Sequence, residues 1–286
     1  MNQPTLEPIR DPDLNDFCQF LVENLSQQRT AKEWARAFLQ DWGVEKPNNG
    51  FLLRDEGRIV GGIGAIYAER QIRGNLERFC NITSWCVLDE YRTQSMRLAI
   101  SLTSQPGFHF TDLTPTEVVS KTLQFLKFKP MNERQAVWPN PPWPFSLLAG
   151  VRVITDANTI EQVLSPEDTR AWLDHKHLPW LKHLAIGRPG DFCHVVYKKT
   201  HLKGLPGAFI LGFSKPEALI KYRFALGNHL LFKDGLIFTR VESRLLPRTP
   251  WPAIELSGYR NKVFRSETLT EADISNLYTE IVALNI

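Results

Sequence analysis

The chain has 286 residues, more than the roughly 100 to 200 residues of a typical single domain, so two packed modules are expected. Its content of 43% hydrophobic and 23% charged residues is that of a globular protein and excludes an intrinsically disordered chain. The formal net charge of +3 suits an anionic ligand, and without a lysine- and arginine-rich run we expect no nucleic-acid partner.

Residues 1–20 contain early acidic residues and no apolar stretch of the length that a signal peptide or a membrane span requires. The sequence therefore predicts a cytoplasmic protein with no membrane partner. The cysteines stand apart without a CxxC pair: they are Cys18, Cys80, Cys86 and Cys193. This spacing predicts reduced thiols, with neither a zinc ribbon nor a disulfide framework.

The first half of the chain alternates between helical and strand patterns of apolar residues. A capping box of Thr30 and Glu33 marks the start of one helix, and proline at 115 marks the start of another. In chain order we expect helices over 13–28 and 30–39, strands over 50–54, 59–67 and 78–88, a helix over 89–103, a strand over 108–111 and a helix over 114–126.

A segment with four prolines and two tryptophans follows, from Trp138 to Pro144, and it can form neither a helix nor a central strand. We therefore expect a first module over 1–137, a linker over 138–150 and a second module over 151–286. The second module is expected to hold helices over 160–164 and 166–173, strands over 194–198 and 208–213, a helix over 216–231, strands over 236–245 and 253–264, and a helix over 270–284.

Two segments of the first module resemble the GNAT acyl-CoA N-acyltransferase superfamily. Residues 85–98 (WCVLDEYRTQSMRL) are similar to its central strand, its corner and the helix that follows, and residues 123–131 (LQFLKFKPM) are similar to a late element of its fold. The second module repeats the order strand, strand, helix. The resemblance implies an α/β (α+β) fold of two tandem GNAT-like modules, with mixed, mostly antiparallel sheets flanked by helices.

The resemblance also implies a site for acetyl-CoA or another acyl-CoA as cosubstrate. A strand that splays from its neighbour can hydrogen-bond the pantetheine arm, and a helix N-terminus favours the diphosphate. On this basis Cys86, Val87 and Leu88 contact the arm, and the diphosphate cradle consists of Arg92, Thr93, Gln94, Ser95, Met96 and Arg97.

Aminolysis of a thioester needs a proton acceptor. His109 and Asp112 lie on and just beyond the expected 108–111 strand, and Asn81 and Thr83 share one side of the central strand, where they can hold a water. The alternatives are a hydrogen-bonded sheet histidine, a turn aspartate and ordinary strand polarity.

Other clusters have simpler interpretations. The segment 175–183 holds three histidines but only Asp174 as a nearby carboxylate, so we expect no metal and interpret it as a basic, aromatic surface loop. The glycines at 61, 62 and 64 are expected to admit a ligand or a neighbouring strand closely. Arg240, Glu242 and Arg244 alternate on one face, either as a salt-bridged solvent face or as a pocket for an anionic or sugar acceptor.

The leading hypothesis is an acyl-CoA-dependent N-acyltransferase that moves an acyl group, expected to be acetyl, to a small-molecule amine such as an amino sugar or amino acid. The alternative is a non-catalytic binding or scaffold protein with a degenerate coenzyme A site, marked by Ser95, Arg97, Leu123 and Lys127. A homodimer that completes its site across subunits is a further hypothesis. An open gap between the strands 78–88 and 108–111 favours the enzyme, and a gap filled by Trp85 or Arg97 favours the scaffold.

Overall fold

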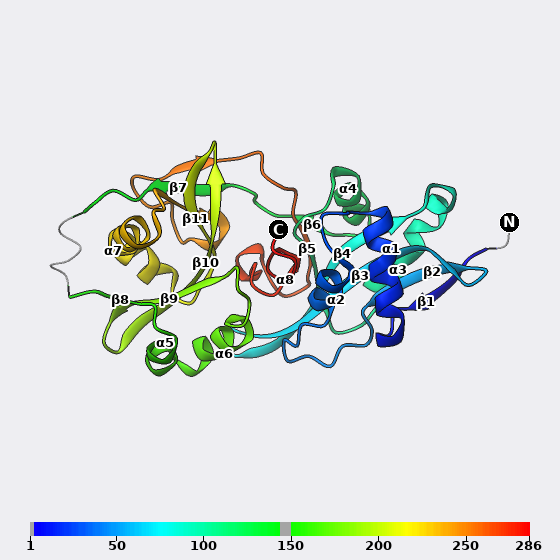
Figure 1. Cartoon of the computed structure of the whole chain (residues 1–286), viewed down its shortest axis with the longest axis horizontal. Helices are drawn as coiled ribbons and strands as arrows, with labels where there is room; N and C mark the ends of the chain where they lie inside the picture. The colour runs from blue at the N-terminus through cyan, green and yellow to red at the C-terminus, as the bar shows by residue number, and fades with distance from the viewer. Residues whose placement is uncertain (1–2, 144–149) are drawn as a thin grey trace. The chain divides into compact units, whose positions relative to one another are not determined.

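The computed structural model describes residues 3–143 and 150–286. These residues divide into two compact units: unit 1 holds the chain up to Met131 together with Arg260–Ile286, and unit 2 holds Asn132–Tyr259. Each unit is built on one seven-stranded sheet with helices packed against it (Figure 1). The expected α/β class, with two mixed and mostly antiparallel modules, is confirmed.

The sheet of unit 1 has the strand order β1-β2-β3-β4-β5-β14-β6, and of its described strand pairs only β4–β5 is parallel. The strands are β1 (Thr5–Pro8), β2 (Gly50–Asp55), β3 (Arg58–Ile72), β4 (Asn75–Val87), β5 (His109–Asp112), β6 (Lys129–Pro130) and β14 (Val263–Arg265). The helices are η1 (Asp11–Asp13), α1 (Leu14–Asn24), α2 (Ala31–Phe38), η2 (Asp89–Gln94), α3 (Ser95–Thr103), α4 (Glu117–Phe125), η5 (Glu271–Asp273) and α8 (Glu280–Ala283).

Helices cover both faces of this sheet. Alternate residues of β3 point to opposite faces. Gly62 faces α1, because a Cβ atom there would overlap the ring of Phe17. Ile63 faces the other way and packs in one buried core with Leu98 of α3 and Leu123 of α4. Helices α1 and α4 therefore lie on opposite faces.

The glycines of β3 make room for aromatic side chains. Gly64 faces the ring of Phe38 from α2, as Gly62 faces that of Phe17. The two phenylalanine rings pack against each other with their centroids 5.8 Å apart. The close approach that was expected at these glycines is therefore made by side chains of the covering helices. A larger residue at either glycine would push its helix off the sheet.

The last part of the chain returns to unit 1. Val263 of β14 pairs with Asp112 of β5 and with Pro130 of β6, so β14 fills the place between these two strands. The structure thereby differs from the expected module over 151–286, because Arg260–Ile286 belongs with the first unit. The strand expected over 253–264 is two strands that belong to different sheets.

The sheet of unit 2 has the order β13-β7-β12-β11-β10-β9-β8, with β11 and β12 parallel. Its strands are β7 (Gln135–Pro139), β8 (Arg152–Ile154), β9 (Lys182–Arg188), β10 (Asp191–Leu202), β11 (Leu205–Phe213), β12 (Phe238–Glu242) and β13 (Ile254–Leu256), and its helices are α5 (Ala157–Val163), α6 (Pro166–His175), α7 (Pro216–Asp234) and η4 (Ser243–Leu245). No helix in the described ranges has the length and apolarity needed to cross a bilayer.

The boundary between the units precedes the expected linker. Trp138 lies in β7 and is 3% exposed in the core of unit 2, so the proline- and tryptophan-rich segment starts as an internal strand. Proline is tolerated there because Pro139 is the last residue of β7. Residues 144–149 of the expected linker lie outside the described residues.

Candidate functional site

Strands β4 and β5 separate part-way along their length. Their parallel ladder ends at the pair Asn81↔Thr111, whereas β4 stays paired with β3 on its other edge as far as Gly61↔Val87. Among the described residues, 82–87 has no strand partner on the β5 side. Backbone groups on that edge can therefore hydrogen-bond an extended ligand that carries amides, as an added strand would.

A β-bulge shapes this edge. The register between β3 and β4 shifts between Gly62 and Gly64, opposite the part of β4 that contains Ser84. Ser84 has a φ of 53°, in the left-handed region that non-glycine residues rarely adopt. A bulge bends and twists its strand, which accounts for the divergence of β4 from β5.

A cleft of about 890 Å³ opens at the splayed edge. It is lined by the end of β4, by η2, by the first turn of α3, by one side of α4 and by Asn24 at the end of α1. Because α1 and α4 cover opposite faces, the walls of the cleft come from both faces of the sheet. The predicted coenzyme-binding residues that line it are Cys86, Val87, Leu88, Arg92, Thr93, Ser95 and Met96.

The other two predicted cradle residues do not line the cleft. Arg97 donates from Nη1 to the backbone oxygen of Pro4 at 3.0 Å and to Oε1 of Gln94 at 3.1 Å. Its guanidinium thus holds the chain before β1 against the start of α3. Neither side chain blocks the cleft.

Helix η2 and the start of α3 offer both charge and hydroxyl groups. Arg92 is 73% exposed and forms an ion pair with Asp89 at 2.8 Å, which contributes little to stability in this exposed setting. The hydroxyls of Thr93 and Ser95 lie on the same wall. The backbone N–H of Ser95 already donates to the oxygen of Arg92, so this amide of the expected cradle is engaged.

The wall formed by β4 is mostly apolar. Trp85 lines the cleft and packs partly against the core of unit 1, with its indole Nε1 buried and without a hydrogen-bond partner in the described part of the chain. Burial raises the pKa of the Cys86 thiol, so this cysteine is a protonated lining group and a poor nucleophile. The cleft beside the end of β4 is open, and its other walls come from η2, α3 and α4.

His109 lies away from the cleft. Its Nε2 is 2.8 Å from Oε2 of Glu77, and its ring packs 5.3 Å from that of Phe79. It is the first residue of β5, opposite Phe79, whereas the splay begins beyond Thr111. The structure therefore gives His109 the hydrogen-bonded sheet role that was the alternative to catalysis.

Asn81 and Asp112 both lie where the ladder between the two strands ends. Asn81 Nδ2 donates to Thr111 Oγ1 at 3.1 Å, and Asp112 is 5% exposed, with Oδ1 accepting from the backbone N–H of Thr114 at 3.2 Å. Burial, followed by the charge of Glu280, raises the pKa of Asp112 well above its ordinary value. A raised pKa favours the protonated carboxyl, which can donate a proton and take one up in exchange.

Thr83 lies two residues beyond the last β4–β5 pair and is 7% exposed. Its Oγ1 is 3.3 Å from Oγ of Ser84, the residue of the bulge. Thr83 thus lies on the unpaired part of β4, close to where the strands part.

Sequence reasoning missed Glu280, which joins this buried group from the C-terminal segment. Its backbone N–H donates to Oδ1 of Asn81 at 2.7 Å, and its side chain is fully buried. The only sequence signal was a glutamate near the start of an apolar run. That pattern does not show that the glutamate hydrogen-bonds to β4 and to the chain after β5.

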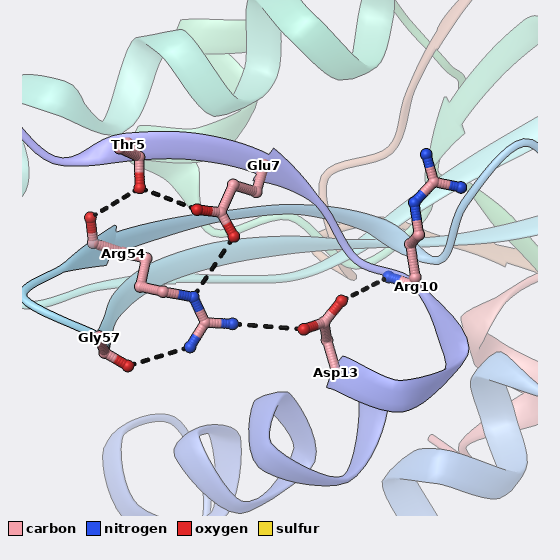
Figure 2. A network of polar contacts seen from close by, with 6 residues as sticks. All are labelled: Thr5, Glu7, Arg10, Asp13, Arg54 and Gly57. Atoms are coloured by element: carbon pink, nitrogen blue, oxygen red, sulfur yellow. Dashed lines mark hydrogen bonds and ion pairs between the residues drawn. The ribbon is translucent and has the colours of Figure 1, made fainter.

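A smaller pocket of about 290 Å³ lies beside α1 and shares Asn24 with the cleft. Asp16 and Glu23 of α1 line it opposite Arg54 and Arg58. Figure 2 shows how Arg54 is held: its Nε lies 3.3 Å from Glu7, its Nη2 lies 3.3 Å from Asp13, and its Nη1 donates to the oxygen of Gly57 at 3.0 Å. This wall is therefore preorganised.

Unit 2 differs from two sequence interpretations. The segment expected to be a basic surface loop contributes His175, which is 0% exposed, and His183, which packs against His194. In the described residues no group of three or more histidine, cysteine or acidic side chains is arranged to hold a metal. Arg244 and Glu242 form a buried ion pair at 2.7 Å, not a solvent face.

Comparison with solved structures identifies the fold. A GCN5-related N-acetyltransferase from Anabaena variabilis superposes with a TM-score of 0.58 at 13% identity, covering 91% of this chain and 72% of that one. One from Kribbella flavida superposes with a TM-score of 0.57 at 14% identity, covering 91% and 70%. No family model and no curated protein matches the sequence. The chain has the GNAT fold, which confirms the resemblance.

Proposed function

We propose that the chain is an acyl-CoA-dependent N-acyltransferase that uses the cleft of unit 1. The observation that carries this proposal is the open cleft along the unpaired edge of β4, with residues 85–88 and the start of α3 on its walls. The proposal is supported by the fold and by the agreement between the cleft lining and most of the residues that the resemblance assigns to the cosubstrate.

The residues present fit such a cosubstrate. Amide groups of the pantetheine arm would pair with the free backbone edge of 82–87, beside the apolar side chains of Val87 and Leu88. Arg92 and the hydroxyls of Thr93 and Ser95 offer a positive charge and donors to a diphosphate. The cosubstrate supplies a thioester carbonyl that an amine can attack.

The chain's own groups support the transfer in two ways. Free backbone N–H groups at the splayed edge can donate to the oxygen that becomes negative as the amine attacks. The amine must also lose a proton, and the protonated carboxyl of Asp112, near the apex of the splay where the strands separate, can relay a proton from the amine to the leaving thiolate. A new C–N bond forms, the C–S bond breaks, and the thiolate takes up a proton.

The apex favours a short acyl group. Asn81, Thr111 and Glu280 close it with a buried, hydrogen-bonded polar group, where an extended alkyl chain would leave polar atoms without partners. Acetyl-CoA is therefore the expected donor. The small pocket beside Asn24 has Asp16 and Glu23 on one wall and Arg54 and Arg58 on the other, which suits an amine acceptor that also carries an anionic group, such as an amino acid.

A second candidate is a non-catalytic protein of the same fold. It is favoured by Leu123, a buried apolar residue with no group that could donate a proton to the leaving thiolate, and by the engaged N–H of Ser95. The engaged N–H of Ser95 concerns cosubstrate binding, and Leu123 concerns the transfer step. A binding measurement followed by a transfer assay therefore separates the two candidates.

Isothermal titration with acetyl-CoA and with octanoyl-CoA tests the proposal. We expect saturable binding of acetyl-CoA, weaker binding of octanoyl-CoA, and at least a tenfold loss of acetyl-CoA affinity in Arg92→Ala. Arg170→Ala is the matched control, because Arg170 is also an exposed arginine paired with a neighbouring aspartate, but in α6 of unit 2. No binding of either thioester overturns the proposal, and binding without acetyl transfer to any of a panel of amines favours the second candidate.

A further inference from the structure

The ladder between β4 and β5 ends at a residue from the C-terminal segment. Glu280 is the first residue of α8, and its backbone N–H donates to Asn81 Oδ1 on β4 at 2.7 Å. Its Oε1 accepts from the backbone N–H of Leu113 at 2.8 Å and from Thr114 Oγ1 at 3.0 Å, just past the end of β5. One residue thus joins both strands where their own pairing stops.

The hydrogen bonds of Glu280 connect β4 to the chain after β5 at the point where the backbone ladder between the two strands has ended. Helix α8 packs against α2 and β4, and β14 of the same returning segment pairs with β5. The returning segment is therefore attached to each of the two diverging strands. Displacement of Glu280 would free Asn81 from Leu113 and Thr114 and let the cleft change its width.

A second carboxyl shares this buried place. Asp112 is the last residue of β5 and is 5% exposed, and Glu280 is 0% exposed. Burial raises the pKa of both groups, and the negative charge of Glu280 adds to the rise at Asp112. The pair therefore keeps a proton at pH values where exposed carboxyls are ionised.

One carboxylate oxygen has no hydrogen bond to stabilise a charge. Glu280 Oε2 is buried and has no partner in the described residues. Several charged groups on the neighbouring strands and helices have partners of their own. Among them are Glu33 of α2 with Thr30, His109 of β5 with Glu77 of β4, Lys262 beside β14 with Asn276, and Arg265 of β14 with the backbone oxygens of Leu126 and Thr103. Full ionisation of the pair would thus place two negative charges in a buried site.

We propose that Glu280 is a positioning residue that clamps β4 and β5 together where their ladder ends, and that deprotonation of the Glu280–Asp112 pair loosens the clamp and weakens acyl-CoA binding as the pH rises. The clamp itself stands apart from the proposed function, and only its effect on acyl-CoA rests on it. The sign follows from linkage: a raised folded-state pKa gives stability that is present at low pH and lost as the pH rises through that pKa.

The test compares the wild type with Glu280→Gln and Glu280→Ala by hydrogen exchange of residues 82–87 at pH 6 and pH 9, normalised to the unfolded chain at each pH. Glutamine keeps an acceptor oxygen for Leu113 and Thr114 but cannot ionise. We expect the wild type to exchange like Glu280→Gln at pH 6 and at least fivefold faster at pH 9. Glu280→Ala should exchange at least tenfold faster at both pH values.

The binding arm uses acetyl-CoA titration at the same two pH values. We expect the wild type to bind at least threefold more weakly than Glu280→Gln at pH 9 and equally at pH 6. Glu267→Gln, an exposed glutamate of the same segment, is the matched control and should follow the wild type throughout.

Two results overturn the inference: equal exchange of wild type and Glu280→Gln at both pH values, or unchanged exchange in Glu280→Ala. If Glu280→Ala does not fold, the comparison with Glu280→Gln at pH 9 decides. If acetyl-CoA does not bind the wild type at all, the proposed function fails, while the exchange arm still decides whether Glu280 is a clamp.

Discussion

Arg97 Nη1 donates a hydrogen bond to the backbone oxygen of Pro4 at 3.0 Å, which ties the start of α3 to the segment before β1. Arg92 lies in the preceding η2 helix and lines the cleft. Two arginines that the sequence placed in one diphosphate cradle therefore have different roles: Arg97 supports the fold, and Arg92 is available to a ligand.

Replacing Arg97 should separate these roles. We expect Arg97→Ala to lower the free energy of unfolding by about 1 to 2 kcal/mol, because the carbonyl of Pro4 loses a charge-assisted donor. Acetyl-CoA affinity should stay within twofold of the wild type, in contrast to the tenfold loss expected for Arg92→Ala. Urea unfolding and calorimetric titration measure the two quantities, and a large affinity loss in Arg97→Ala with unchanged stability would contradict the assignment.

A bulky residue on α4 should block the cleft. Val118 is 74% exposed and lines the cleft, so a larger side chain there displaces solvent and not core. We expect Val118→Trp to lower acetyl-CoA affinity at least tenfold while changing the melting temperature little. Lys121→Trp is the control on the same helix, since Lys121 is exposed and does not line the cleft. Equal affinities in the two variants would show that the ligand does not enter beside α4.

Lys127 follows the end of α4 in a left-handed conformation, with a φ of 67°. The backbone N–H of Phe128 donates to the oxygen of Leu123 at 3.1 Å, as at a helix C-terminus that favours glycine. A side chain there costs about 1 to 2 kcal/mol, partly offset by the greater freedom of glycine in the unfolded chain. We expect Lys127→Gly to raise the free energy of unfolding by about 0.5 to 1 kcal/mol.

Chemical denaturation measures this gain. Lys129→Gly is the comparison, because Lys129 is an exposed residue of the strand β6, where it pairs with Phe264 and has no positive φ that glycine would relieve. We expect Lys129→Gly to leave the free energy of unfolding unchanged or slightly lower. A loss of stability in Lys127→Gly would mean that the lysine side chain makes a contact that outweighs its backbone strain.

The parts of the fold and site that could be predicted from sequence are local ones. The end of β4, the turn at 89–94 and the start of α3 are adjacent in sequence, so one segment carried both the strand pattern and the residues that line the cleft. The capping box of Thr30 and Glu33 could likewise be predicted from the sequence, and the structure confirms it. Short-range chemistry decides such features.

The parts that could not be predicted depend on long-range pairing. Asn81 and Glu280 are 199 residues apart, and nothing in the apolar pattern of 253–264 showed that the chain leaves one sheet and joins another within it. Gly258, with a φ of 81°, marks the break between the two strands. A glycine inside a strand pattern is the signal that was available.

His183 and His194 make unit 2 sensitive to acid. Their rings are stacked with centroids 5.4 Å apart, His183 Nδ1 lies 3.2 Å from His194 Nε2, and the indole of Trp172 packs edge-on 4.9 Å from His183. Burial, helped by the neighbouring histidines, lowers the pKa of His183 to about 3 and that of His194 to about 4. Both rings are therefore neutral in the folded protein at pH 5 to 7.

Acid should destabilise unit 2 through this pair. The unfolded chain binds protons at an ordinary histidine pKa near 6.5 while the folded unit does not, so stability is present above about pH 6.5 and is lost as the pH falls toward 4. The expected slope is on the order of 1 kcal/mol per pH unit for each histidine. Hydrogen exchange of β9 and β10 between pH 4 and 7 measures it within unit 2.

The variant His194→Asn should halve this slope, because one of the two coupled protonations is removed. His177→Asn, which replaces an exposed histidine of the same segment, should leave it unchanged. A slope that is the same in all three proteins would mean that the folded unit accepts protons at this pair as readily as the unfolded chain, by opening the contact between Trp172 and His183. Because deprotonation of Glu280 and Asp112 acts in the opposite direction, unit 1 should lose protection as the pH rises toward 9, whereas unit 2 should lose protection as the pH falls toward 4.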